Sequence, residues 1–238
     1  MRKIFISDIH GCLDAFQRLL KQIDYNSAND HLILCGDYVD RGPSSKQVID
    51  YIIDLKNRGG KLVCLKGNHD DWMHHSLMNR PGDMDRSMWL DQGGKETLLS
   101  YFEAEEIENE GVEMICRKLA DQFPEHVTFM ENLQYYYADD DHIAVHAGFP
   151  PELKKFWEAD PDHFLWMREP FLSTKAKAGE DRRIIFGHTP TPNLQEKAAP
   201  WFSPDDDKIG IDGGAAFGFQ LNALLYENGT YSYEAVEV

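Results

Sequence analysis

Five short apolar runs, each followed closely by Asp, Asn or His beside a glycine, constrain this chain more than any other feature. The polar segments are Asp8-Ile9-His10-Gly11, Gly36-Asp37, Gly67-Asn68-His69-Asp70, His146-Ala147-Gly148 and Gly187-His188. Runs rich in Val, Ile, Leu and Phe are typical of buried strands. Ligand sites in an open sheet collect beyond the carboxyl ends of the strands, so we expect the five segments to meet at one rim. This inventory of side chains is typical of a metal site.

The order of the expected elements predicts an α/β fold. Strands alternate with helices at the start of the chain, which is typical of parallel strands. Ser44 and Gln47 have the spacing of a capping box at the start of the second helix, which Gly59-Gly60 should end. The other elements expected in this part are strands at 3–7, 31–35 and 61–65 and a first helix at 13–23.

Residues 71–134 change to a mostly helical pattern, which predicts a helical insertion or cap over the site rather than a second domain. Asp139-Asp140-Asp141 predicts a hairpin turn, because a calcium loop needs ligands over about twelve residues. The strands expected after the insertion are 135–137, 142–146, 183–186, 208–211, 221–226 and 231–236.

Size and charge narrow the class of protein. The motifs spread from residue 8 to residue 190 of 238, so we expect a single domain over 1–238. A net charge of −17 disfavours binding to the nucleic-acid backbone and favours a bound cation. The alternative is that the acidic surface only keeps the protein soluble. The four cysteines form no C-x-x-C pair, and no apolar run approaches the ~20 residues of a membrane span. We therefore expect reduced thiols and a cytoplasmic monomer with neither a membrane nor a nucleic-acid partner.

The polar residues at the strand ends predict two divalent cations. One cation would be bound by Asp8, His10 and Asp37. The other would share Asp37 and take three further ligands, Asn68, His146 and His188. These ligands suit manganese, our first expectation, and also iron, zinc or cobalt. Two such ions ~3.5–4 Å apart can hold a bridging hydroxide that attacks phosphorus. Helix-capping aspartates and core histidines would explain one or two of the segments, but not all five.

Together with Val39-Asp40-Arg41-Gly42, these segments resemble those of the calcineurin-like metallophosphoesterases. They are most similar to the phosphoprotein phosphatase branch, as in bacterial and phage serine/threonine protein phosphatases. The resemblance extends from Asp8 through Asp212-Gly213-Gly214 to the closing strands. It implies a central β-sandwich of two mixed sheets flanked by helices, here with the helical insertion around 71–134.

The resemblance also implies roles for four further residues. His69 matches the general acid that protonates the departing alkoxide, and Asp40 matches the carboxylate that orients its imidazole. Arg41 and, with a looser match, Arg168 correspond to arginines that bind phosphate. The alternatives are a surface salt bridge for Arg41 and a structural role for Arg168.

The expected substrates are phosphate monoesters on serine or threonine of phosphoproteins. The main alternative is symmetrical cleavage of diadenosine tetraphosphate, a small phosphoester that a sister group hydrolyses. In that group tryptophan commonly follows the final histidine, whereas Thr189 follows His188 here. A catalytically silent metal-binding scaffold would show losses among the matched residues, and none is missing. Related folds also include nucleases and cyclic-nucleotide diesterases, which the Asp40-Arg41 pair disfavours.

Two other sets of residues allow more than one interpretation. His74 and His75 suggest metal binding, but adjacent residues do not share a helix face, so we expect them to be exposed. The five tryptophans suggest a substrate groove, but we expect core packing for most of them: Trp72, Trp89, Trp157, Trp166 and Trp201.

Overall fold

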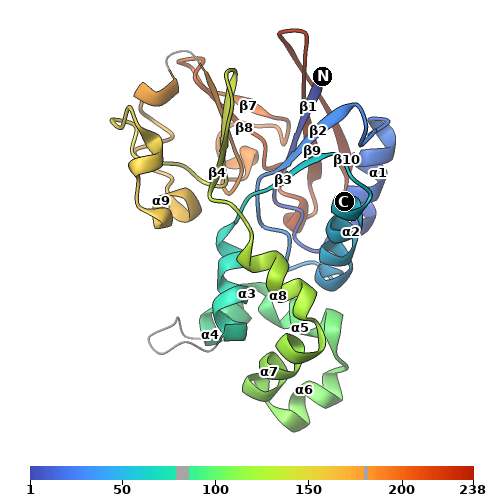
Figure 1. Ribbon diagram of the computed structural model, residues 1–238. Helices are drawn as coiled ribbons and strands as arrows, with labels where there is room; N and C mark the ends of the chain where they lie inside the picture. The colour runs from blue at the N-terminus through green and yellow to red at the C-terminus, as the bar shows by residue number, and fades with distance from the viewer. Residues whose placement is uncertain (79–85, 180–181) are drawn as a thin grey trace.

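Two five-stranded mixed sheets form the centre of the molecule (Figure 1). The structure is a computed structural model that describes residues 1–78, 86–179 and 182–238. The first sheet has the order β10-β9-β1-β2-β3 and the second has the order β4-β5-β6-β8-β7. The strands are β1 Arg2–Ile6, β2 Asp30–Leu34, β3 Lys61–Cys64, β4 Tyr136–Ala138, β5 His142–Val145, β6 Arg183–Phe186, β7 Trp201–Phe202, β8 Lys208–Gly210, β9 Gln220–Glu227 and β10 Thr230–Glu237.

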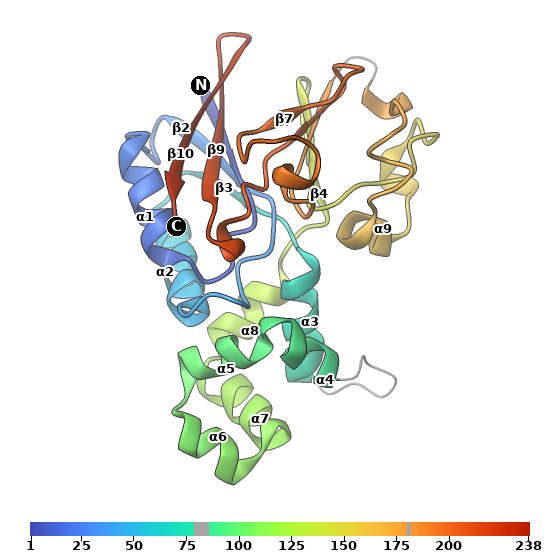
Figure 2. The same cartoon turned by 180° about the vertical axis from the view of Figure 1, so that it is seen from behind.

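Helices flank the sheets and form the predicted insertion. In Figures 1 and 2, α1 and α2 lie beside the first sheet, α9 lies beside the second, and α3 to α8 lie at one end of both. Residues 79–85 of the predicted insertion lie outside the described residues. None of the helices described is long and apolar enough to cross a membrane. The helices are α1 Leu13–Gln22, α2 Ser45–Asn57, α3 Asn68–Met78, α4 Arg86–Trp89, α5 Lys95–Tyr101, α6 Ala104–Glu110, α7 Val112–Gln122, α8 Pro124–Glu131 and α9 Pro161–Trp166.

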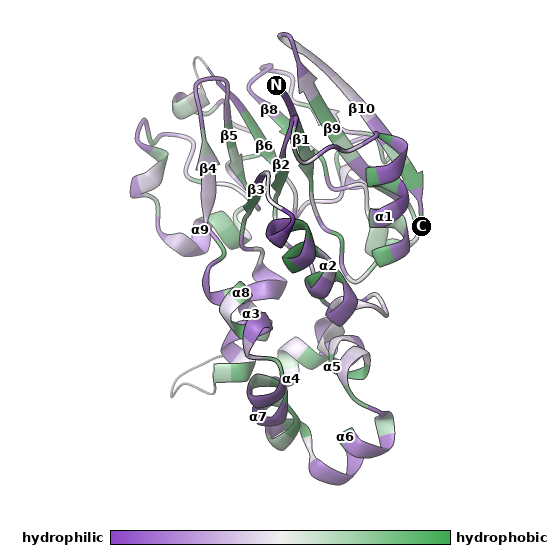
Figure 3. Ribbon diagram, turned by 45° about the vertical axis from the view of Figure 1, so that its right-hand side comes forward, coloured by the Kyte–Doolittle hydropathy of each residue, from purple (hydrophilic) through white to green (hydrophobic). Residues whose placement is uncertain are grey.

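Alternation along the strands builds an apolar core on both faces of each sheet. Phe5 in β1 packs between the sheets, whereas Ile4 and Ile6 point to the opposite face, toward the helices. In β6, Ile185 packs between the sheets, and Ile184 and Phe186 join the cluster on the outer face. Figure 3 shows the same division, with hydrophobic strands inside and mixed helices outside. Burial on both faces explains why these strands are nearly continuous apolar runs.

The parallel strands direct their carboxyl ends to one rim of the sandwich. β1, β2 and β3 are mutually parallel in the first sheet, as are β5, β6 and β8 in the second. The loops that follow them bond to one another: the Asp8 amide donates to the Gly36 carbonyl at 3.0 Å, and the Gly187 amide donates to the His146 carbonyl at 2.8 Å. The predicted meeting of the five polar segments at one rim is therefore confirmed.

The fold agrees with the predicted class and differs in two details. The expected capping box is wrong: Ser44 makes no side-chain capping bond, and its amide donates instead to the Gly11 carbonyl at 3.1 Å. Strand β7 was not predicted, because its two residues are too few to show a period, and pairing with β8 alone defines it. The Asp139-Asp140-Asp141 hairpin turn is as expected, between the antiparallel strands β4 and β5. All four cysteines are free thiols.

Candidate metal and phosphate site

A cavity of about 560 Å³ opens at this rim, and seven of the ten sequence-predicted site residues line it. The other three are buried directly behind the cavity wall: His10 and His146 contact Asp37, and Asp40 contacts His69. The seven that line the cavity are Asp8, Asp37, Arg41, Asn68, His69, Arg168 and His188.

The loops at the strand ends hold many of these side chains on left-handed backbone. Asp70 accepts hydrogen bonds from the amides of Gly67, Asp37 and Tyr38 at 2.8–2.9 Å, and so ties two loops together. Left-handed φ at residues other than glycine costs free energy, of order 1–3 kcal/mol each, and persists only where surrounding bonds impose it. The site residues with positive φ are Asp8 (55°), His10 (44°), Asp37 (56°), Asp40 (72°), Arg41 (68°) and His188 (63°).

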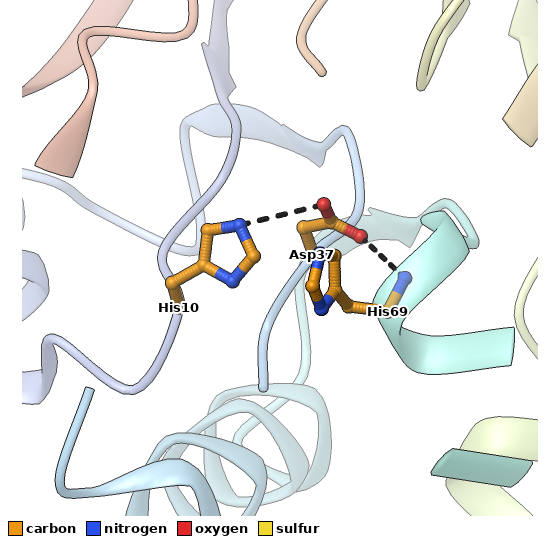
Figure 4. A group of neighbouring side chains, drawn as sticks. All are labelled: His10, Asp37 and His69. Carbon is orange, nitrogen blue, oxygen red and sulfur yellow. Dashed lines mark hydrogen bonds and ion pairs between the residues drawn. The ribbon is translucent and has the colours of Figure 1, made fainter. Parts of the chain in front are cut away.

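Two imidazoles present lone pairs to the same carboxylate oxygen. His10 Nδ1 lies 2.7 Å from the Val39 carbonyl, and His146 Nδ1 lies 2.9 Å from the Cys35 carbonyl. Since a carbonyl oxygen only accepts, each Nδ1 donates, which leaves Nε2 as the acceptor in a neutral ring. Both Nε2 atoms lie 3.4 Å from Asp37 Oδ2 (Figure 4 shows His10 and Asp37). In the neutral rings both Nε2 lone pairs therefore face the Asp37 carboxyl group, an arrangement that a cation between them would complete.

Burial sets the charge of this cluster. It lowers the pKa of His10 and His188 well below the usual histidine value and also lowers the pKa of His146. It raises the pKa of Asp37 well above the usual carboxyl value, and the nearby Asp8 carboxylate raises that pKa further. Neutral imidazoles and a carboxylate that resists ionisation both indicate that positive charge would stabilise this site.

Potential ligand atoms form two overlapping groups around Asp37, and one group includes His69, for which the predicted role was general acid rather than ligand. Ligand atoms of His10, Asp37 and His69 lie within 4.8 Å of one another, as do those of Asp37, His146 and His188. Asp37 is shared, as expected from the sequence. The His188 Nε2 atom is buried and has no hydrogen-bond partner within the described part of the chain.

Asp8 and Asn68, the other two predicted ligands, lie next to these groups. The Asp8 carboxylate accepts hydrogen bonds from the His188 amide at 3.0 and 3.2 Å and from the Ser7 hydroxyl. Asn68 Oδ1 lies 3.0 Å from His146 Nε2. Both side chains also line the cavity, so each can turn an oxygen toward a cation there.

His69 and Asp40 form a hydrogen-bonded pair next to these groups. Its Nδ1 atom lies 2.7 Å from Asp40 Oδ2. Asp40 also accepts hydrogen bonds from Trp89 Nε1 at 3.0 and 3.1 Å and from Thr97 Oγ1 at 2.6 Å. Burial raises the pKa of Asp40 to about 8, although the Thr97 and Trp89 bonds oppose that rise. Burial lowers the pKa of His69 well below its usual value, and the Arg41 charge lowers it further.

Arg41 is inside the cavity, so the surface salt bridge considered for it is not what the structure contains. Its guanidinium lies 3.2 Å from His10 Nε2 and 3.1 Å from His69 Nε2, and 5.0 Å from the ring centre of Phe217. Arg168 donates to the His188 carbonyl at 3.2 Å on another side of the cavity. Two cationic groups thus border one group of buried carboxylates.

Sequence reasoning missed four residues that shape the site. Asp70 was visible as the end of Gly67-Asn68-His69-Asp70 but received no role. Asp212 lines the cavity, and burial raises its pKa well above the usual value. Its signal was the Asp212-Gly213-Gly214 segment. Trp89 and Thr97 bond to Asp40 from the insertion, and no local pattern could indicate that contact.

The expectations for the tryptophans and for the two histidines have different outcomes. Core packing for most of the tryptophans is confirmed, because Trp72 and Trp89 are buried in the core and Trp201 packs against it. Trp72 and Trp166 also line the cavity, with their rings 4.8 Å apart, and Trp157 is 49% exposed. The expected exposure of His74 is wrong. His74 is buried, with 6% exposure, whereas His75 remains half-exposed. The burial of His74 results from packing of the insertion against α3, which sequence periodicity does not report.

Comparison with known proteins adds independent findings. The family model described as "Calcineurin-like phosphoesterase" matches residues 1–224. The chain is 30% identical to the asymmetrical bis(5'-nucleosyl)-tetraphosphatase PrpE of Anoxybacillus flavithermus, over 93% of this chain and 89% of that protein. It is 25% identical to serine/threonine-protein phosphatase 1 of Salmonella typhimurium, over 91% and 88%. The crystal structure of a putative diadenosine tetraphosphatase matches with a TM-score of 0.67 and 19% identity, over 98% of this chain and 93% of that one.

Proposed function

The chain belongs to the calcineurin-like phosphoesterase family, and from that premise we propose that it hydrolyses phosphate monoesters on serine and threonine side chains of phosphoproteins. The observation that carries this proposal is the convergence of acceptor atoms around Asp37, next to an Asp40–His69 pair and two arginines.

The residues at the rim suit two divalent cations that share Asp37. The proposed ligands of one are Asp8, His10 and Asp37; the second would share Asp37 and add the other three, Asn68, His146 and His188. Fixed Nδ1 donors and a buried, unbonded His188 Nε2 within the described residues support this assignment. Manganese is our first expectation among the metals that this ligand set suits. Bound divalent cations supply an activated water and neutralise charge on the phosphoryl group.

The arginines are proposed to bind the phosphate oxygens. A phosphate dianion competes with neutral imidazoles for the Arg41 guanidinium, and charge-assisted hydrogen bonds are roughly twice as strong as neutral ones. Arg41 should therefore leave His10 and His69 when substrate binds, while Arg168 approaches from the other side of the cavity. The departure of Arg41 removes the positive charge that lowers the pKa of His69, and it frees Nε2 of the His69 ring.

The released His69 is proposed to hold the proton that the leaving oxygen needs. Asp40, 2.7 Å from Nδ1, stabilises the protonated ring. An alkoxide of serine or threonine is a poor leaving group without a proton, whereas a nucleoside phosphate leaves readily as an anion. A positioned acid is thus of most use for an alkyl monoester, which favours the phosphoprotein substrate.

Hydrolysis of a dinucleoside tetraphosphate is the second candidate. Trp166, Phe217 and Phe219 line the cavity with 38%, 56% and 51% of their surfaces exposed, and exposed aromatic rings can stack on bases. The similarity to a protein named as a bis(5'-nucleosyl)-tetraphosphatase also favours it. The alternative that we considered from the sequence was symmetrical cleavage, whereas that relative is named asymmetrical.

A side-by-side assay tests both statements. The purified chain with Mn²⁺ should hydrolyse phosphoserine and phosphothreonine peptides with a higher kcat/KM than diadenosine tetraphosphate. A tenfold preference for the dinucleotide would reverse the assignment, and its products would identify the cleavage mode. Metal-stripped protein in chelator should be inactive on an aryl phosphate, and full turnover there would refute metal dependence altogether.

A further inference from the structure

The side chain of His74 in α3 is buried without a hydrogen-bond partner among the described residues. Its exposure is 6%, yet neither Nδ1 nor Nε2 has a hydrogen-bond partner among the residues that the structure describes. An unsatisfied buried polar atom typically costs about 1–3 kcal/mol, and such atoms are rare in native proteins. A second polar atom on the same ring adds to that cost. Something that binds imidazole nitrogen would remove it.

Three further potential ligands surround this ring. Asp71 precedes His74 by three residues and His75 by four, so both histidines are neighbours of Asp71 on the helix surface. One ligand atom from each of Asp71, His74 and His75 lies within 4.8 Å of the other two. Glu131 at the end of α8 brings Oε1 to 3.9 Å from His74 Nε2. His75 Nδ1 lies 3.7 Å from Asp71 Oδ2.

These separations are too long for hydrogen bonds but close to those of ligands on one ion. Ligand atoms at ~2.0–2.1 Å from a tetrahedral zinc stand about 3.3 Å apart. The nearby Lys66 bonds to Asp71 Oδ1 at 3.1 Å, which leaves Oδ2 directed at His75. The group of Asp139, Asp141 and His142 differs, because Lys3 Nζ pairs with both of its carboxylates, at 2.6 Å from Asp139 and 2.8 Å from Asp141. In the group on α3, the Lys66 ion pair engages only Oδ1 of Asp71.

We propose that Asp71, His74, His75 and Glu131 form an additional divalent-metal site that joins α3 to α8, separate from the site at the strand ends. Two imidazoles with carboxylates suit a borderline transition metal of the zinc class, and the affinity order of such sites places Zn²⁺ above Mn²⁺. The expected occupant is therefore a zinc-class ion rather than manganese. An ion here would fix α3, whose first turn carries Asn68 and His69, against α8.

Metal counting tests the site without reference to catalysis. Metal-stripped wild-type protein is saturated with Zn²⁺, freed of excess ion by gel filtration and analysed for bound zinc. His74→Phe fills the same buried space without a ligand atom, and we expect it to bind one equivalent fewer than wild type. His163→Gln is the matched control, because His163 Nδ1 is also buried without a described partner but belongs to no group of potential ligands in the described chain. It should retain the wild-type count.

Two further measurements keep the outcome decisive. Asp71→Asn alters a side chain with 17% exposure, so it should fold even where His74→Phe does not, and it should also lose the equivalent. Co²⁺ added to wild type should give a visible absorption band that both variants lack. Equal zinc counts in wild type and either folded variant would overturn the site. Loss of the zinc equivalent alone leaves the proposed phosphatase function unaffected, since that is tested by the substrate assay.

Discussion

Replacing His69 by asparagine should separate proton donation from every other function of the site. The change removes a ring bonded to Asp40 at 2.7 Å and approached by Arg41 at 3.1 Å, but it retains the backbone amide that donates to Asp37 Oδ1 at 3.0 Å. Asp40 keeps its hydrogen bonds from Trp89 and Thr97, so no buried carboxylate is left unpartnered. We therefore expect a folded protein that still binds metal.

The expected loss follows from the worth of a general acid. Proton transfer by a positioned side chain contributes about 10²–10⁴-fold, which corresponds to roughly 2.7–5.4 kcal/mol of transition-state stabilisation. A phosphoserine peptide should lose this full amount in kcat/KM. An aryl phosphate should lose less than about tenfold, because its leaving group departs without a proton. Both substrates are assayed at saturating Mn²⁺ with bound metal counted in each protein.

The structure also predicts how Asp40 and His69 combine. Asp40 is buried behind His69 and contacts the reaction only through that ring, so the double variant Asp40→Asn/His69→Asn should be about as slow as His69→Asn alone. Equal losses on alkyl and aryl esters would refute the acid role of His69. Additive losses in the double variant would show that Asp40 acts by another route.

Three other perturbations test the electrostatics and packing of the site. Burial raises the pKa of Asp37 well above its value in the unfolded chain. The contribution of Asp37 to folding is therefore present below the unfolded-state pKa and is lost as pH rises through the folded-state pKa. In chelator, Asp37→Asn should raise Tm at pH 8 but not at pH 4, and an equal shift of Tm at both pH values would contradict this reasoning. Gly67→Ala would place a methyl group onto Asp37 Oδ1 and should weaken metal binding as measured by calorimetry, whereas Gly59→Ala meets open space and should leave affinity unchanged. Trp89→Phe removes an N–H donor from buried Asp40 and should lower the unfolding free energy by about 1–3 kcal/mol in urea titrations, with no change expected if that hydrogen bond were replaced by water.

The strand ends were predictable because two local signals coincide there. A buried strand gives an apolar run, and a sharp exit from it gives glycine beside a polar residue. In β6, for example, the run Arg183–Phe186 was predicted with its observed bounds, and Gly187-His188 follows at once. Parallel pairing then directs all such exits to one rim, so the sequence alone could predict that the polar residues of the five segments would be near one another. Arg168 follows α9 rather than a strand, and only the family resemblance indicated it.

Contacts between distant segments were not predictable. Trp89 and Thr97 reach Asp40 from the insertion, and Glu131 of α8 reaches His74 of α3. Such pairs depend on how the helices pack against one another, and the periodicity of the sequence does not indicate that packing. The expected exposure of His74 was wrong for that reason.

The sequence by itself determined which chemical groups are present at the strand ends, because residue type and spacing along a single strand are local properties. Only the tertiary structure decided where their atoms point. The Val39 and Cys35 carbonyls, each from a segment remote from the ring it binds, fix Nδ1 of His10 and His146 and turn both Nε2 lone pairs toward Asp37. The physical reason is that a ring's orientation depends on its partner, and that partner is brought to it by the fold.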